Sequence, residues 1–424
     1  MPCEVVNVGS GFGSNVRAAR CVAAQCYFQR FPRTVDLSLI VDAKQAAHRA
    51  CTFCVMDEAL APMQFDEEGR CECCRDALRR MPFEWWPNEQ GQARLDALVK
   101  QLKLHGVGKK YDAMIGLSGG VDSAYLAHLA VRNFGLRVLA VHVDGGWNSA
   151  PAVHNIESIV RKLNLDLHTF VVEWEEMRDI QLAFLRSSVL NQDIPQDHAF
   201  FSTLYRTAMK YGVRDFLSGV NFSSESIVAP GMGHTYMDLR HLRAIHRRFG
   251  RLPATHFPFM SLQTFIWHSR IARTLHVHKP LNYMAYDKER AKQELTDVYG
   301  WRDYGRKHDE SRFTKFYQEC YLPRKFDFDK RRLHLSSLIV SGQVTRNEAL
   351  AQLSQPISDP KQTARDMRFV AKKLGIDAQE LSQLIGCEPV SHLAYPNQAG
   401  MHRKLMWLRN RVREAGKLLQ SRIR

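Results

Sequence analysis

One stretch near position 118 limits the possible folds of this chain more than any other. Residues 113–117 form an apolar run of strand length, SGGVDS follows at 118–123, and 124–134 has the apolar spacing of a buried helix. The pattern predicts a strand, a glycine turn and a helix. The first amides of such a helix have no partners within it, and the helix dipole favours negative charge beside them. We therefore expect this turn, here called the phosphate turn, to bind a phosphate.

Each residue type in the phosphate turn suits contact with a nucleotide. Glycine lets the backbone approach an anion with no side chain between them, and the two serines offer hydroxyl donors. Asp122 would repel a phosphate, so it either caps the helix or holds the magnesium ion that accompanies a nucleotide. The predicted nucleotide-binding residues are Ser118, Gly119, Gly120, Val121, Asp122 and Ser123. Asp122 and Ser123 are also predicted to be catalytic.

The phosphate turn differs from two better-known phosphate motifs. It lacks the Gly-Lys-Ser/Thr ending of a Walker A loop and the spacing of a dinucleotide fingerprint. It matches SGGxDS and resembles the PP-loop ATP pyrophosphatases, a resemblance that implies cleavage of ATP between the α and β phosphates. The alternative is an ordinary strand-to-helix turn that is rich in glycine and serine.

The elements after the phosphate turn predict an α/β fold with a doubly wound parallel sheet, as in the PP-loop, adenine nucleotide alpha-hydrolase-like proteins. The expected strands lie at 137–143, 167–172 and 215–218, and the expected helices at 150–163 and 201–211. Ligands bind beyond the carboxyl ends of such strands. We therefore add Asp144, after the second strand, and Gly219, after the fourth, to the nucleotide-binding residues.

Clustered cysteines precede the predicted sheet. Cys51 and Cys54 form one Cys-x-x-Cys pair and Cys71 and Cys74 form another, a spacing typical of a tetrahedral structural zinc site. Cys73 can replace one of its neighbours as a ligand. The segment between the pairs has too few apolar residues to fold alone, so Zn²⁺ would stabilise it. The alternative is a redox or sulfur-relay pair.

Composition places broad limits on the function. The chain has 424 residues, 45% of them apolar, and Lys and Arg exceed Asp and Glu by 59 to 44, giving a net charge of +15. This charge suits an anionic substrate, nucleic acid or an anionic membrane surface. No run of about 18 apolar residues and no leader pattern occurs, so we expect no transmembrane segment and a cytoplasmic location.

The remaining segments define the expected domains. These are an extension at 1–47 with little predicted order, a zinc-knuckle segment with a linker helix at 48–106, an ATP-binding domain at 107–330 and a helical C-terminal region at 331–424. Residues 227–300 are predicted to be a helical insertion that covers the pocket, because Phe257, Phe259, Phe265 and Trp267 have the spacing of buried core residues. The alternative is a patch that binds nucleic acid. The basic helix at 401–424 reads as a solvated surface helix, or as a membrane or RNA contact.

Several stretches together resemble one family. They are the cysteine pairs, SGGVDS, VHVDGGWNS at 141–149, PLNYMAY at 280–286, GWRDYGRKHDESRFTKF at 300–316 and LPRKFDFDKRRLHLSSLI at 322–339. The chain resembles the N-acetyl sugar amidotransferases of surface-polysaccharide and nonulosonate biosynthesis, from about Cys51 to near the C-terminus. Arg306 and Asp309 depart from the family pattern, where a glycine precedes the lysine and a second histidine follows the first.

The resemblance implies a reaction. The oxygen of an N-acetyl group on a nucleotide-linked sugar attacks the α-phosphate of ATP, and ammonia then displaces AMP to leave an acetamidino group. The phosphate turn and a magnesium ion on Asp122 would stabilise the charge on the α-phosphate. Lys307 and Lys325 would add cationic contacts to the phosphates, and His308 or Glu310 would remove a proton from the incoming ammonium.

The source of ammonia is expected to be another protein. A class II glutaminase needs an N-terminal cysteine, whereas Pro2 precedes Cys3 here, and the sequence around Cys387 lacks the second glycine of a class I elbow. The resemblance implies a separate glutaminase with a cyclase-like ammonia-channelling arrangement, similar to imidazole-glycerol-phosphate synthase.

Two other functions remain open at this point. A tRNA-modifying PP-loop enzyme, for thiolation or lysidine formation, would explain the positive charge and the zinc site. The chain has no cysteine between Arg75 and Glu319, however, which counts against a thiolase, so we do not expect nucleic acid as a partner. A non-catalytic nucleotide-binding partner of a glutaminase is the other alternative.

Overall fold

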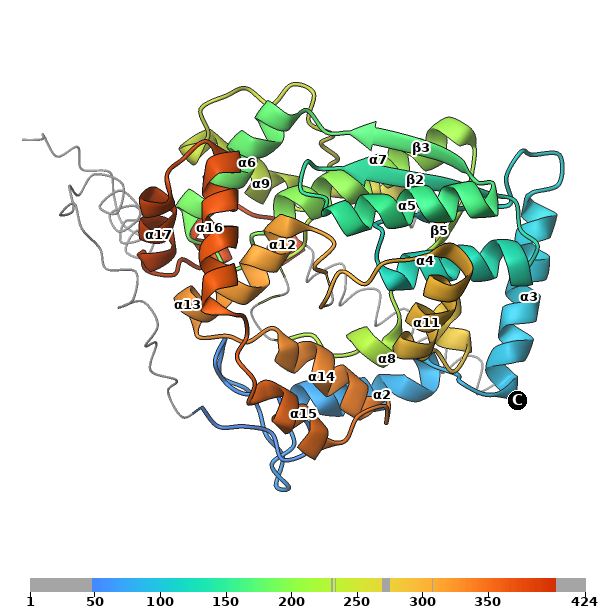
Figure 1. Cartoon of the computed structure of the whole chain (residues 1–424), viewed down its shortest axis with the longest axis horizontal. Coiled ribbons are helices and arrows are strands. Elements are labelled where there is room, and N and C mark those ends of the chain that lie inside the picture. The colour runs from blue at the N-terminus through green and yellow to red at the C-terminus, as the bar shows by residue number, and fades with distance from the viewer. Residues whose placement is uncertain (1–47, 230–231, 233, 269–274, 307, 402–424) are drawn as a thin grey trace, which may run out of the picture.

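The computed structural model describes residues 48–229, 232, 234–268, 275–306 and 308–401. The extension at 1–47, with Cys3, and the basic helix at 402–424 lie outside these ranges. The fold contains a five-stranded parallel sheet with the strand order β3-β2-β1-β4-β5. Its strands β2 and β3 are labelled in the upper part of Figure 1. Its strands are β1 (Ala113–Gly116), β2 (Val138–Asp144), β3 (Asp166–Val171), β4 (Asp215–Leu217) and β5 (His276–His278).

The strand order places the phosphate turn at a topological switch point. From β1 the chain runs through β2 to β3 on one side, and then returns to place β4 on the other side of β1. Ile115 of β1 therefore pairs with Ala140 of β2 and with Leu217 of β4. The connections leave in opposite directions from the carboxyl end of β1, and this opens a crevice there. The phosphate turn follows directly after β1.

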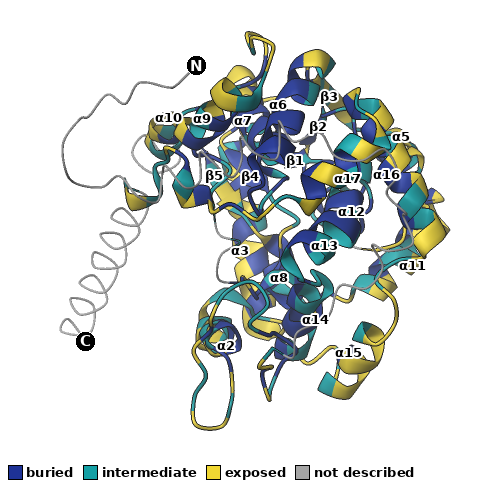
Figure 2. Cartoon of the chain, turned by 90° about the vertical axis from the view of Figure 1, so that its left-hand side faces the viewer, coloured by how far each residue is buried: buried dark blue, intermediate teal, exposed yellow. Residues whose placement is uncertain are grey.

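Alternate residues of the strands face two different helical layers, as the pleat requires. Met114 and Val141 pack with α6 (Trp174–Ser187), α7 (Ile194–Tyr211) and α9 (Leu239–Phe249). Ile115 and Ala140 pack on the opposite face with α3 (Glu89–His105), α4 (Val121–His128), α5 (Ala150–Leu163) and α11 (Lys288–Tyr299). The buried strands lie between these layers in Figure 2. The prediction of a doubly wound α/β fold is confirmed.

The predicted elements agree with the structure except in two regions. All four predicted strands are present, and α5 spans 150–163 as expected, whereas α7 starts at Ile194 instead of 201 and α6 was not predicted. Within 227–300 the structure contains the fifth strand, β5, beside α9, α10 (Leu262–Ile266), the 3-10 helix η4 (Pro280–Tyr283) and α11. Phe257 is buried there as predicted, but Trp267 is 54% exposed.

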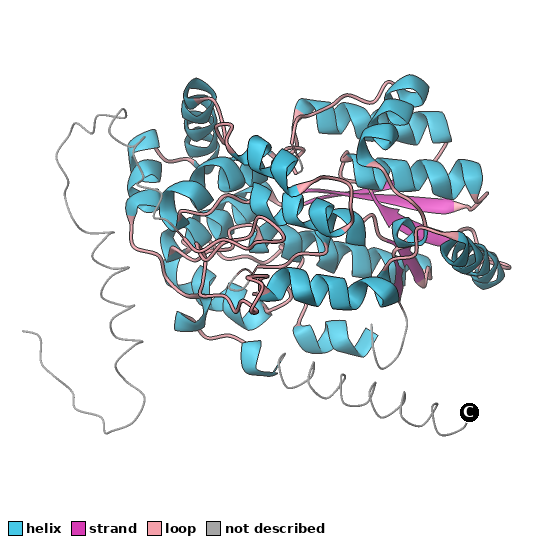
Figure 3. Ribbon diagram, turned by 90° about the horizontal axis from the view of Figure 1, so that it is seen from below, coloured by secondary structure: helices cyan, strands magenta, loops and turns pink. Residues whose placement is uncertain are grey.

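A second, helical part of the molecule lies beside the sheet (Figure 3). Its elements are α2 (Glu72–Glu84), α8 (Phe222–Glu225), α12 (Arg312–Phe316), η5 (Tyr317–Tyr321), α13 (Leu322–Phe326), α14 (Arg331–Val340), α15 (Arg346–Leu353), α16 (Pro360–Leu374), α17 (Ala378–Gly386) and η6 (His392–Ala394); a π-helical turn, η2 (Leu129–Asn133), extends α4. The cysteine-rich segment and α14 meet here, because Val55 N donates to Ser336 Oγ at 3.2 Å. Within the described ranges, no helix combines the length and apolarity required to cross a bilayer.

Candidate functional site

The phosphate turn is held in place by contacts from two other segments. Gly119 adopts φ +83°, and a Cβ at this position would lie 2.5 Å from the carbonyl oxygen of Ala152 in α5. Only glycine fits both the conformation and the contact. The carbonyl of Gly119 accepts hydrogen bonds from Asn155 Nδ2 at 3.2 Å and from Trp301 Nε1 at 3.3 Å. The turn is therefore anchored to α5 and to the segment at 300–316.

Hydroxyl groups contact the amides at the start of α4. Gly120 N donates to Ser118 Oγ at 3.2 Å, and Val121 N donates to Tyr304 Oη at 3.1 Å. Ser123 Oγ lies 3.3 Å from Ser118 Oγ and donates to the carbonyl of Gly120. The two serines assigned from the sequence thus lie together, and Tyr304 joins them from the other half of the chain. A bound phosphate would take over these amides from the hydroxyl oxygens.

Asp122 does not cap the helix. The N-cap of α4 is Gly120, and no side chain caps it. Asp122 instead accepts a hydrogen bond from Tyr286 Oη at 2.5 Å and lines the cavity described next. Helix capping, one of the two roles considered for Asp122, is therefore wrong, and the role of magnesium ligand stays a prediction.

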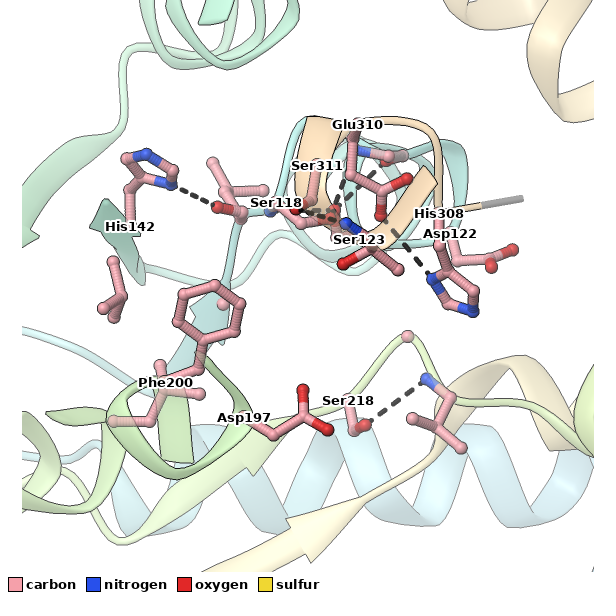
Figure 4. Close-up of a pocket in the computed structure, with 18 of the residues that line it drawn as sticks. Ser118, Asp122, Ser123, His142, Asp197, Phe200, Ser218, His308, Glu310 and Ser311 are labelled. Atoms are coloured by element: carbon pink, nitrogen blue, oxygen red, sulfur yellow. Dashed lines mark hydrogen bonds and ion pairs between the residues drawn. The ribbon is translucent and has the colours of Figure 1, made fainter. Parts of the chain in front are cut away.

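The phosphate turn forms one wall of a cavity of about 380 Å³, here called the first cavity (Figure 4). Its predicted lining residues are Ser118, Gly120, Val121, Asp122, Ser123, Gly219, His308 and Glu310. The apolar side chains Val141, Phe200, Leu204 and Phe216 form another wall, which suits an adenine ring. No described residue of 227–300 lines this cavity, and the expectation that this segment covers the pocket stays a prediction.

The segment at 300–316 reaches the first cavity because it is bonded to the β2–α5 loop. Ser149 N donates to the carbonyl of Glu310 at 2.8 Å, and Arg312 N donates to the carbonyl of Trp147 at 2.8 Å. Glu310 Oε1 then lies 3.8 Å from His308 Nδ1. The other oxygen, Oε2, is buried and has no hydrogen-bond partner within the described part of the chain. Glu310 lies beside Gly120, since a Cβ at that glycine would be 3.0 Å from Glu310 Oε1.

Two carboxylates that were not predicted also line the first cavity. Asp193 and Asp197 lie one turn apart at the start of α7, and Asp193 Oδ1 accepts a hydrogen bond from Thr314 Oγ1 at 3.1 Å. Burial raises the pKa of Asp193 to about 6 and the pKa of Asp197 to about 7, and for Asp197 the negative charge of Asp193 adds to the rise. The i, i+4 spacing was visible in the sequence, but nothing there indicated that α7 faces the phosphate turn.

His142 and Asn148 are further lining residues that were not predicted. His142 Nδ1 lies 2.8 Å from the carbonyl of Leu117, and Asn148 Nδ2 lies 3.0 Å from His142 Nε2. These contacts fix the orientation of the His142 ring. Both residues lie in the VHVDGGWNS stretch, so the sequence signal existed but had not been assigned to side chains.

Three predicted residues that the structure describes, Gly119, Asp144 and Lys325, are not among the residues that line the first cavity. Asp144 is not a lining residue, and its Oδ1 accepts a hydrogen bond from Gly146 N at 2.7 Å within its own turn. Lys325 is buried, and its ammonium donates to the carbonyls of Leu384 at 3.0 Å and Ile385 at 3.2 Å at the end of α17. The expected phosphate contact of Lys325 is therefore not made. Lys307 lies outside the described residues.

The four predicted zinc ligands form a compact cluster, here called the cysteine cluster. Cys51 Sγ lies 3.7 Å from Cys74 Sγ, and Cys54 and Cys74 each place Sγ 3.6 Å from Cys71 Sγ. A tetrahedral zinc with Zn–S bonds of about 2.3 Å requires sulfurs separated by roughly 3.8 Å. All four residues are fully buried. The donor set and its size therefore fit zinc.

Cys73 is not part of the cysteine cluster. Its Sγ points to Met63 Sδ, 3.9 Å away, and the group of possible metal ligands contains only the other four cysteines of this segment. The question of whether Cys73 replaces a neighbour is thereby answered. Four thiols that close the coordination sphere leave no position for substrate, which favours a structural role over a redox or sulfur-relay role.

Comparisons with known proteins agree with this arrangement. A family model described as NAD synthase matches residues 92–196, and one described as LPS biosynthesis protein WbpG-like, C-terminal domain, matches residues 310–409. The resemblance to PP-loop amidotransferases is confirmed. The first match contains the phosphate turn, and the second begins at Glu310. Thus the two matched segments meet at the first cavity. A search of curated proteins found no match.

Two solved structures share a low overall similarity with the chain. NMN synthetase from Francisella tularensis is 20% identical, with a TM-score of 0.26, covering 54% of this chain and 92% of that one. The NH3-dependent NAD synthetase from Campylobacter jejuni, in complex with a nitrate ion, is 18% identical with a TM-score of 0.26, covering 49% of this chain and 83% of that one. Scores this low support no further conclusion.

Proposed function

We propose that this protein is an ATP-dependent, AMP-forming amidotransferase of lipopolysaccharide or related surface-glycan biosynthesis. It would convert an N-acetyl group on a nucleotide-linked sugar to an acetamidino group with ammonia. The observation that carries this proposal is the junction at the first cavity. There the phosphate turn, inside the NAD synthase match, lies against Glu310, the first residue of the WbpG-like match.

The first step would load AMP onto the sugar. The acyl oxygen attacks the α-phosphorus of ATP, an O–P bond forms, and the bond to the β-phosphate oxygen breaks to release pyrophosphate. The backbone amides of Gly120 and Val121, which donate to Ser118 Oγ and Tyr304 Oη in this structure, and the hydroxyls of Ser118 and Ser123 would donate to the α-phosphate as charge accumulates on it. Asp122 would hold magnesium, which supplies further positive charge to the phosphates.

The second step would form the new C–N bond. Ammonia adds to the imidate carbon, the C–O bond to AMP breaks, and the added nitrogen loses a proton. We propose that Asp197 accepts this proton. A carboxylate with a pKa of about 7 accepts a proton near neutral pH far better than an ordinary aspartate does. His308 and Glu310, the earlier candidates, lie 3.8 Å apart on the opposite wall. There they would orient the acyl group.

The remaining parts of the proposal concern cofactors and partners. The cysteine cluster would hold a structural Zn²⁺. Ammonia would come from a separate glutaminase through cyclase-like channelling subunits, and the enzyme would work in the cytoplasm on a nucleotide sugar. A tRNA-modifying activity gains no support from the lining of the first cavity. Its described lining residues include five carboxylates and two histidines but no lysine or arginine that could contact an RNA backbone.

The test is to incubate the zinc-loaded protein with ATP, magnesium, ammonium and a panel of UDP- and CMP-linked acetamido sugars. We expect one sugar to lose about one mass unit, because NH replaces O, with one AMP formed per product. Formation of ADP in place of AMP, or no AMP with any acetamido sugar, would contradict the proposal. AMP formed with transfer RNA and not with sugars would support the tRNA-modifying alternative instead.

A further inference from the structure

A second cavity of about 530 Å³ adjoins the first. It lies between α8, α11, the segment at 305–309 and helix α14, and it extends to the end of α15. Glu225, His308 and Gln318 line both cavities. These three side chains therefore lie where the two cavities adjoin.

The two cavities have walls from different parts of the chain. The phosphate turn and the ends of β1 and β2, all within the NAD synthase match, provide much of the first cavity. More than half of the residues that line the second cavity fall within 310–409, the range of the WbpG-like match. The part of the site that distinguishes this chain from an ordinary ATP-binding fold is therefore the second cavity.

The second cavity is a rigid, charged site. Its basic residues are Lys288, Lys292, Arg306, Lys330 and Arg331, with the histidines His308 and His334, and its acidic residues are Glu225, Asp309, Glu319 and Asp329. Arg331 makes a bidentate pair with Asp329, with contacts of 2.7 to 3.1 Å, and also donates to carbonyls at the end of α15. Arg306 pairs with Glu319 at 3.4 Å. These bonds fix the walls, as a preformed ligand site requires.

Lys330 connects the two cavities electrostatically. Its side chain lines the second cavity, and its Nζ lies 3.9 Å from Met232 Sδ. Its positive charge also acts on Asp193 and Asp197 in the first cavity, where it opposes the rise in their pKa values that burial causes. Lys330 therefore lies close to the boundary between the cavities. An anion beside Lys330 would be near the first cavity without occupying it.

The second cavity also contains donors for a neutral polar ligand. Gln318, Gln352 and Gln355 line the second cavity with amide groups, and His334 Nδ1 lies 3.2 Å from the carbonyl of Ser224, which fixes its ring. Amide and imidazole groups pair with sugar hydroxyls and with the edges of a base. The combination of cations with these groups matches a phosphate joined to a sugar.

We propose that the second cavity binds the nucleotide-phosphate part of the sugar substrate, with Lys330 and Lys288 at the phosphate. The sugar then extends past His308 and Gln318, so that its N-acetyl oxygen faces the phosphate turn. This placement rests on the proposed function. It gives that function a specific geometry, since ATP and acceptor enter from different cavities and meet at the three shared side chains.

The test is direct binding with the first cavity occupied. The zinc-loaded full chain is saturated with magnesium and α,β-methylene-ATP and titrated calorimetrically with UDP-N-acetylglucosamine or CMP-N-acetylneuraminate. We expect one probe to bind with one site per chain. Lys330→Met and Lys288→Met should each weaken this binding at least about tenfold, because a charge-assisted contact is lost. Lys361→Met, at an exposed position on α16, is the matched control and should bind like wild type.

Three results would overturn the placement. They are binding that is unchanged in both variants, binding that disappears when α,β-methylene-ATP is present, and no binding of either probe at millimolar concentration. Thermal melts of each variant separate a lost contact from a lost fold. Failure of the proposed function looks different. In that case a probe binds in a manner that depends on Lys330, but no acetamido sugar yields AMP. If instead AMP and product form with an unchanged KM for the sugar in both variants, the function stands and the placement falls.

Discussion

The phosphate turn and the cysteine cluster are both short motifs, yet the fold completes them in different ways. All four thiols of the cluster come from residues 51–74, and their sulfurs lie at the separations that a zinc ion requires. The phosphate turn supplies only one wall of the first cavity, and the others come from β2, α7, β4 and the segment at 300–316. A site whose groups are close in sequence is determined locally, whereas the first cavity depends on how distant segments pack.

The largest effect should follow loss of a cluster thiol. Cys54→Ser should reduce bound zinc from about one per chain to almost none and lower the free energy of unfolding by on the order of 5 kcal/mol. The carbonyls of Cys51 and Cys54 accept hydrogen bonds from Arg346 at 3.0 and 3.2 Å, so α15 loses its support as well. Metal analysis and urea unfolding measure both effects.

Cys73→Ser is the matched control for that experiment. Its thiol lies in the same segment but contacts Met63, so zinc content should be unchanged. Zinc lost from Cys73→Ser and retained in Cys54→Ser would show that the ligand set is different from the cysteine cluster.

The next effect tests the assembled site. Asp122→Asn should lower the rate of AMP formation by about 10²- to 10³-fold, because the magnesium ligand is lost, while the amide still accepts the hydrogen bond from Tyr286. The melting temperature should stay close to that of wild type. Asp166→Asn, on the edge strand β3 and paired with Lys110, is the control and should keep full activity. A fully active Asp122→Asn protein would contradict the catalytic role of the phosphate turn.

A third prediction concerns a buried group of histidines that no sequence motif had predicted. The rings of His234, His241 and His392 pack together, with Asp238 Oδ2 3.3 Å from His234 Nε2 and with Asn191 N donating to His392. Burial lowers the pKa of His241 to about 2 and that of His392 to about 3, from an ordinary value of 6.5. The unfolded chain therefore binds protons below about pH 6.5 that the folded protein does not bind.

This difference makes stability fall as the pH decreases from about 6.5, by up to roughly 1.4 kcal/mol per pH unit for each histidine, with no contribution above pH 7. Urea unfolding at pH 7.5, 6.5, 5.5 and 4.5 measures the slope. His241→Phe should reduce this slope, because one of the two histidines no longer contributes. An unchanged slope in that variant would place the acid sensitivity elsewhere.

The smallest effect concerns Lys325, which was predicted to contact the phosphates but donates to carbonyls at the end of α17. Lys325→Met should lower the free energy of unfolding by about 1–3 kcal/mol, because the carbonyls at the end of α17 lose a buried donor. The KM for ATP should not change. A KM raised tenfold with unchanged stability would restore Lys325 to the phosphates, as the sequence had predicted.

Local patterns explain what could be predicted before the structure. Four strands were predicted from their apolar runs, although β3 proves to be largely exposed, and the phosphate turn was predicted because SGGVDS directly follows one of them. β5 was missed because His276–His278 is three residues long and only partly buried. Asp193 and Asp197 were missed because carboxylates one turn apart are ordinary on a helix, and only packing shows which surface they face.

The sequence by itself determined the fold class, the glycine-rich turn after the first strand and the cysteine cluster, since each depends on spacing within a few tens of residues. Tertiary structure alone decided that Glu310 reaches the phosphate turn, that Lys325 supports α17, and that a second cavity opens beside the first. The physical reason is that hydrogen bonds and burial between segments far apart in the chain fix where a side chain points. Those contacts cannot be predicted from the spacing of residues along the chain.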